Sequence, residues 1–265
     1  MRAILTWHSL DRSGSPISVA PDEFRRQVTW LLEENVRIVS VEDLLRLDDM
    51  TDAVALTFDD GFSNTLTDAV PVLRDHRLPA TCFIVTGQVG GDNRWGGRTT
   101  PGIPTLPLLD WDDLARLRDA GVTLGGHTRT HPRLPTLGPA ELDHEIRQCA
   151  DEIRQRLGTE PTGFAYPYGA VDSAVATVVA RTYAWACTTE LRPLRSDARP
   201  HLLPRLDMWY FGETFRRTGW GSPLFRSWVW ARHQGRRLRA LLPARHPIDP
   251  ATPDGQPTGS DADRR

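Results

Sequence analysis

The sequence contains no lysine at all, and its opposite charges nearly cancel. All 32 basic residues are arginine and stand against 34 acidic residues, which gives a net charge of −2. A chain this close to neutral has no general attraction for nucleic acid, and it carries no nucleic-acid recognition motif. We therefore expect no nucleic-acid partner.

Cysteine is scarce as well. Cys82, Cys149 and Cys187 lie far apart, and no two of them form a CxxC pair or a zinc-finger spacing. An odd, scattered set of cysteines does not build a disulfide framework. We expect three buried free thiols in a reducing compartment.

Long apolar runs are also missing. No stretch approaches the roughly 18 apolar residues of a membrane span. The first 15 residues do not read as a signal peptide, because His8 interrupts their short apolar run. These features predict a cytoplasmic protein, with peripheral contact at the inner face of the membrane left open.

Strand-like apolar runs alternate with amphipathic helix patterns over the first 210 residues. The run at 53–60 is typical of a buried strand, and residues 138–158 carry a clear apolar helical stripe. About eight strand signals are separated mostly by helices, which predicts an α/β protein with parallel strands and crossover helices. The length allows the sheet to close into one barrel.

The C-terminal stretch has a different composition. Residues 211–246 are rich in arginine and tryptophan, and no acidic residue lies between Glu213 and Asp249. We expect a basic helical extension after a barrel at 1–210. It would either pack on the barrel or lie on an anionic membrane leaflet. Residues 247–265 are polar and rich in proline and glycine, and we expect them to be disordered.

Polar residues follow several of the strand-like runs. Asp59 and Asp60 end one run, and His127 follows another, with His131 four residues later. Two imidazoles and a carboxylate are a common ligand set for a divalent metal, and a second carboxylate could take a proton from water. Asp pairs also cap turns, and histidines pair by chance, but the positions at strand ends favour a metal site.

These motifs resemble the polysaccharide deacetylase family, also called the NodB-homology family or carbohydrate esterase family 4. The matching segments are TFDDG (57–61), HTRTH (127–131) and FAYPYG (164–169), and the resemblance covers about residues 3–208. It implies a single distorted (β/α) barrel of about seven to eight parallel strands. It also implies metal-dependent hydrolysis of an N-acetyl group on a sugar.

The resemblance also assigns roles to matching residues. It implies that Asp59 is the general base and that Asp60, His127 and His131 bind the metal. It implies that the backbone N–H of Tyr168 holds the oxyanion. Zinc is the expected ion, although the same donors suit cobalt, nickel and iron.

The chain departs from the family pattern in two places. Ala165 stands where many members carry an arginine that tethers the base, and Arg205 is a candidate to replace it. A late L-x-H motif that supplies the general acid is absent after Thr189. His8 at the end of the first strand is our candidate acid, and a hydrogen-bonded histidine at the rim is the alternative.

Substrate contacts are expected from Tyr166 and Pro167 in the third motif, from Arg205, and from Trp95. Trp95 lies in the long Gly/Pro-rich loop at 90–109, and loops of this length in compact domains are usually functional or disordered. Trp7, by contrast, is expected to fill the core.

The predicted function is removal of N-acetyl groups from amino sugars of a poly- or oligosaccharide during assembly of a bacterial surface polysaccharide or exopolysaccharide. A lipid-linked saccharide precursor is one form that this substrate could take. Two alternatives stay open at this point. One is a deformylase or deacylase of another non-peptide amide, and the other is a carbohydrate-binding homologue without activity.

Overall fold

A computed structural model of the chain describes residues 1–212 and 217–241, and for 237–241 it describes the backbone alone. The strands are β1 (Arg2–Trp7), β2 (Arg37–Ile38), β3 (Ala53–Phe58), β4 (Ala80–Ile84), β5 (Val122–Gly126), β6 (Gly163–Ala165), β7 (Trp185–Cys187) and β8 (Arg205–Asp207). They form one sheet in the order β7-β6-β5-β4-β3-β1-β8, and β2 pairs with β3 off this path. Each of these strand pairs is parallel, which confirms the predicted parallel α/β architecture.

The two edges of this sheet approach each other and nearly close it into a barrel. Cys187 in β7 forms a parallel bridge with Leu203, two residues before β8. The N–H of Leu203 donates to the carbonyl of Ala186 at 2.9 Å, and the N–H of Thr188 donates to the carbonyl of Leu203 at 2.8 Å. The contact between the edges is short, so the barrel is distorted, as expected.

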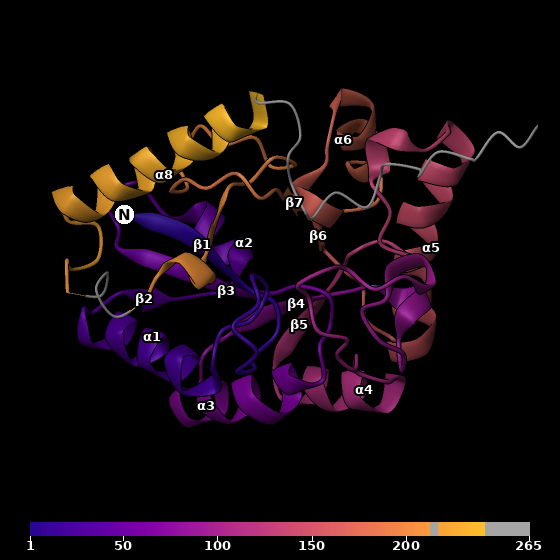
Figure 1. Cartoon of the computed structure of the whole chain (residues 1–265), viewed down its shortest axis with the longest axis horizontal. Coiled ribbons are helices and arrows are strands. Elements are labelled where there is room, and N and C mark those ends of the chain that lie inside the picture. The colour runs from indigo at the N-terminus through magenta and orange to yellow at the C-terminus, as the bar shows by residue number, and fades with distance from the viewer. Residues whose placement is uncertain (213–216, 242–265) are drawn as a thin grey trace, which may run out of the picture.

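Helices surround the strands on the outside (Figure 1). They are α1 (Pro21–Glu33), α2 (Val41–Arg46), α3 (Val70–His76), α4 (Trp111–Asp119), α5 (Pro139–Leu157), α6 (Ser173–Val179) and α8 (Pro223–Leu241). α5 buries the stripe that its sequence predicts and ends at Gly158, whose φ of 63° suits a left-handed helix end. A π-helical turn, Thr65–Ala69, continues directly into α3.

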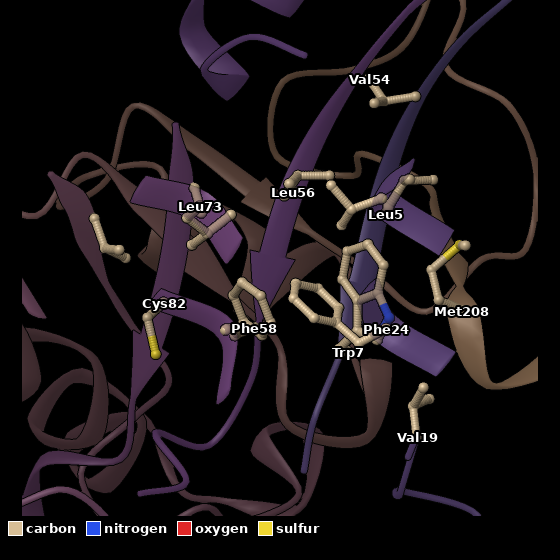
Figure 2. Close-up of a cluster of buried hydrophobic side chains, with 14 of the residues drawn as sticks. Leu5, Trp7, Val19, Phe24, Val54, Leu56, Phe58, Leu73, Cys82 and Met208 are labelled. Carbon is tan, nitrogen blue, oxygen red and sulfur yellow. The ribbon is translucent and has the colours of Figure 1, made fainter. Parts of the chain in front are cut away.

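A cluster of aromatic side chains lies between α1 and the sheet (Figure 2). Trp7 contacts Phe24 edge-on at 5.2 Å and stacks on Phe58 at 5.6 Å between ring centroids. Its indole N–H donates to Gln27 at 2.8 Å. Trp7 is therefore a core residue, as expected, and it fixes the end of β1 immediately before His8.

α8 packs across the N-terminal part of the chain (Figure 1). Its side chains Phe225 and Val229 are buried, and Phe225 stacks on Trp30 of α1 at 6.2 Å. The indole of Trp220, just before the helix, donates to the carbonyl of Met1 at 3.1 Å. One face of the basic extension is thus part of the core.

The predicted disorder at 247–265 lies outside the described residues. Within the described part of the chain, no helix combines the length and the apolar character needed to cross a membrane. Cys82, Cys149 and Cys187 are free and buried, as predicted. Burial raises the pKa of Cys149 to about 11 and that of Cys187 to about 12, so both stay protonated at neutral pH.

Candidate metal centre

The carboxyl ends of the strands carry the residues that the sequence singled out. Asp59 and Asp60 follow β3, His127 follows β5, Tyr166 follows β6 and His8 follows β1. In a parallel barrel these ends meet at one face, where active sites form. These residues line a cavity of about 160 Å³ together with other side chains. The lining residues are His8, Ile17, Asp59, Asp60, Asn93, Trp95, Thr100, Ile103, His127, His131, Tyr166, Tyr168 and Thr189.

Three buried side chains converge in this cavity. One ligand atom each from Asp60, His127 and His131 lies within 4.8 Å of the others. Oδ1 of Asp60 is 3.3 Å from Nε2 of His127 and 3.4 Å from Nε2 of His131. This oxygen is buried and has no hydrogen-bond partner, which is unfavourable unless a cation or donor faces it. The donor set therefore fits a divalent metal.

The two histidines are held in different ways. Nδ1 of His127 lies 2.7 Å from the carbonyl of Ala165, so it donates there and leaves the Nε2 lone pair facing Asp60. The ring of His131 lies between the rings of Trp95 and Tyr168, with centroid distances of 4.3 and 4.6 Å. Ala165 thus serves this site through its backbone oxygen.

The pKa values of these ligands follow from burial and charge. Burial lowers the pKa of His131 to about 3, so its imidazole is neutral and able to bind a metal. Burial would also lower the pKa of His127, but its contact with Asp60 and the charge of Asp59 raise it above the usual value. Burial would raise the pKa of Asp60, and the two histidines outweigh it and lower that pKa.

Asp59 forms a bidentate ion pair with Arg205. Nη1 and Nη2 of Arg205 donate to Oδ1 and Oδ2 of Asp59 at 2.6 and 2.7 Å. Burial would raise the pKa of Asp59, but the charge and hydrogen bonds of Arg205 outweigh it and hold this pKa far below its usual value. A lowered pKa stabilises the fold above the ordinary aspartate range, and that stability is lost only as pH falls through the lowered value. Asp59 is therefore a carboxylate throughout the neutral range.

His8 lies beside this ion pair at the wall of the cavity. Its Nε2 is 3.7 Å from Oδ2 of Asp59, and its side chain is 24% exposed. This distance is longer than a hydrogen bond. His8 lines the cavity close to Asp59 without a hydrogen bond to it, and its role as general acid stays a prediction.

The residues expected to contact substrate divide into two groups. Tyr166, Tyr168 and Trp95 line the cavity. Pro167 and Arg205 are buried and lie outside its lining. The guanidinium of Arg205 donates hydrogen bonds to Asp59, to the carbonyl of Thr188 and to the hydroxyl of Thr6. The structure thus places Arg205 where it can orient Asp59. Its direct contact with substrate stays a prediction.

The sequence patterns did not predict two residues at the site, Asn93 and Glu145. Asn93 is buried in the long loop, accepts from the N–H of Leu106 at 2.8 Å and donates to the carbonyl of Pro104 at 3.0 Å. Glu145 of α5 accepts hydrogen bonds from the turn that carries His131. The only sequence signal for Glu145 was a charged residue on the apolar stripe of its helix.

Comparisons with known proteins agree with this geometry. A family model described as polysaccharide deacetylase matches residues 47–184, more than half of the chain. A poly-beta-1,6-N-acetyl-D-glucosamine N-deacetylase of Staphylococcus epidermidis is 21% identical over 203 residues, which cover 71% of this chain and 67% of the relative.

Solved structures show the same fold. The deacetylase PplD of Streptococcus pyogenes, in complex with acetate, superposes with a TM-score of 0.69 at 20% identity and covers 82% of this chain and 96% of its own. IcaB from Ammonifex degensii gives a TM-score of 0.65 at 23% identity, with 79% and 94% covered. The match of the family model spans Asp59, Asp60, His127, His131 and Tyr168. The chain therefore belongs to the polysaccharide deacetylase family, a family of hydrolases that act on carbon–nitrogen bonds other than peptide bonds.

Proposed function

We propose that the chain removes N-acetyl groups from an N-acetylglucosamine polymer or oligomer, with zinc as the bound ion. The observation that carries the proposal is the convergence of Asp60, His127 and His131 beside the paired carboxylate Asp59 in one cavity. The similarity to the S. epidermidis N-deacetylase supports an amino-sugar substrate.

Asp60, His127 and His131 would hold the ion. A divalent cation supplies Lewis-acid chemistry there, because it polarises an amide carbonyl and makes a water easier to deprotonate. Asp59 then accepts a proton from the attacking water. A carboxylate so tightly paired with Arg205 is a weak base, and it is effective only toward a water that is already acidified.

The remaining steps fall to residues around the cavity. His8 donates a proton to the amine nitrogen as the carbon–nitrogen bond breaks, so that acetate and a free amine leave. The backbone N–H of Tyr168 stabilises the charge that develops on the carbonyl oxygen. Trp95 and the exposed ring of Tyr168 offer flat surfaces for sugar rings at the mouth of the cavity.

The test is acetate release from a panel of substrates by metal-free and zinc-loaded protein. The panel contains β-1,6-linked and β-1,4-linked N-acetylglucosamine oligomers, and an N-formyl analogue. We expect acetate from an amino-sugar oligomer only after zinc is added. Asp59→Asn should lose at least about 100-fold in kcat while it still binds zinc.

The two alternatives give different results in the same assay. A deformylase would release formate from the analogue and no acetate from the oligomers. A binding homologue would leave every substrate intact, and either result would contradict the proposal. Cobalt, nickel or iron in place of zinc would be recognised by metal analysis of protein purified without added metal.

A further inference from the structure

The turn that carries the second metal-binding histidine has an unusual backbone. Thr128 and His131 have φ values of 68° and 63°. This left-handed region is disfavoured for residues with a Cβ, and most of all for a β-branched residue such as threonine. Such a turn persists only when its surroundings fix it.

The imidazole of His131 has little else to hold it in place. Its Nδ1 is buried and has no hydrogen-bond partner. The rings of Trp95 and Tyr168 flank it, but ring contacts allow sliding. The position of Nε2 relative to Asp60 therefore depends on the backbone of residues 127–131.

Glu145 of α5 holds this backbone from the helix side. Its Oε2 accepts from the N–H groups of Arg129 at 2.9 Å and Thr130 at 2.8 Å. Its Oε1 accepts from the hydroxyl of Thr130 at 2.6 Å. One carboxylate thus binds both amides at the centre of the turn.

A second hydrogen bond fixes this turn at the carbonyl of Arg129. The N–H of Gly87 donates to the carbonyl of Arg129 at 2.7 Å. A Cβ at Gly87 would lie 2.6 Å from that oxygen, so only glycine allows this approach. The N–H of His131 also donates to the hydroxyl of Thr128 at 2.9 Å. The turn is clamped between Gly87 and Glu145.

The surroundings of Glu145 in α5 argue against a role in packing alone. The other buried residues of this helix are apolar, namely Leu142, Ile146, Cys149, Ala150, Ile153 and Leu157. Burial of a carboxylate is unfavourable unless its oxygens are satisfied. Leucine at this position would pack without that penalty, so what the carboxylate adds is its grip on the turn.

We propose that Glu145 is a positioning residue for the metal site. By fixing residues 127–131 it sets His131 Nε2 at the distance from Asp60 and His127 that one ion requires. The proposal rests on the metal site and does not depend on the substrate proposed above.

The experiment measures zinc affinity by competition with a chromophoric chelator, together with the visible spectrum of the cobalt-loaded protein. Glu145→Ala removes all three bonds, and we expect zinc affinity to fall about 10- to 100-fold, as for other groups that orient metal ligands. We also expect a changed cobalt spectrum. Glu145→Gln should stay within about 3-fold of the unaltered chain, because its oxygen accepts from both amides and its NH₂ group donates to Thr130.

Glu152→Ala is the matched control. Glu152 lies two turns further along α5 and contacts the side chain of Arg129 at 3.4 Å, not the backbone of the turn. We expect its zinc affinity and cobalt spectrum to be unchanged. Unaltered affinity and spectrum in Glu145→Ala would overturn the proposal, and so would an equal loss in Glu152→Ala.

A variant that does not fold still leaves a test. Thr130→Val removes only the hydroxyl bond to Glu145 and keeps both amide bonds. We expect a fall of about 3-fold in zinc affinity, in keeping with the loss of one of several orienting bonds. No change in affinity and spectrum in this variant would count against the proposal, and acetate release need not be measured.

Discussion

Neighbouring residues of one chemical type do different work at this site. Asp59 faces the guanidinium of Arg205, and Asp60 faces the two imidazoles of His127 and His131. Asp60 can turn this way because its backbone is left-handed, with φ of 71°. Their different partners are the reason why we propose Asp59 as the base and Asp60 as a metal ligand.

His8 gives the clearest prediction for a single side chain. We expect His8→Ala to bind zinc as tightly as the unaltered chain and to lose about 100-fold or more in kcat, because general acids contribute rate factors of this size. Steady-state kinetics and metal analysis measure the two quantities. His144→Ala, on the exposed face of α5, is the control. Near-normal turnover in His8→Ala would rule out the catalytic role.

The motifs predicted the four main residues of the site. They did not predict the residues whose hydrogen bonds keep these four in position. Asp59, Asp60, His127 and His131 lie in short segments of distinctive spacing. Glu145 could not be identified in the same way, because a single charged residue on an apolar helix stripe does not show which backbone it will contact.

At the scale of elements, the loop at 90–109 is the feature that the sequence described least well. Its base is tied by an antiparallel bridge between Asp92 and Pro107 and by another between Phe62 and Leu108. Inside it, Asn93 binds the backbone of Leu106 and Pro104. The loop is therefore an ordered wall of the cavity. Its many glycines and prolines predict an irregular loop and give no sign of these bonds between residues far apart in the sequence.

Asn93→Ala should loosen this wall. Without its two bonds, Trp95 and Ile103 lose their fixed places in the cavity, and we expect KM to rise several-fold with zinc affinity unchanged. Trypsin should cleave after the exposed Arg98 about 10 times faster, since proteolysis follows local opening. Thr99→Ala, exposed in the same loop, is the control. Unchanged KM and cleavage in Asn93→Ala would show that other contacts hold the loop.

Most strands and helices were predictable because their apolar patterns are long and regular. Their ends were less so. The run at 53–60 is expected to be a strand, but β3 ends at Phe58, because its pairing with β1 and β4 stops there. Pairing partners decide where a strand ends, and a single segment of sequence does not contain them.

At the scale of the whole molecule, positive charge is concentrated on the C-terminal helix. α8 carries arginines and no acidic residue, while Leu224 and Trp230 are 71% and 65% exposed. Interfacial arginines each favour an anionic leaflet by about 1 kcal/mol, and tryptophan prefers the interface. The membrane contact expected from the sequence thus concerns the outer face of α8, because the inner face is buried.

We expect the full chain to float with vesicles of phosphatidylcholine mixed with phosphatidylglycerol, and not with phosphatidylcholine alone. High salt should reduce the bound fraction. Trp230→Ser should reduce it several-fold, whereas Met50→Ser, at an exposed apolar residue outside α8, should not. Equal flotation with both kinds of vesicle would contradict the prediction.

The pairing of β1 with β8 has a consequence for how the protein becomes active during synthesis. Asp59 leaves the ribosome early, yet its counter-charge arrives with Arg205, nearly 150 residues later. Until then a shortened nascent chain would have to bury an unpaired carboxylate, which is unfavourable. We therefore expect the site to assemble only once β8 has paired with β1, a contact of long sequence separation that forms slowly.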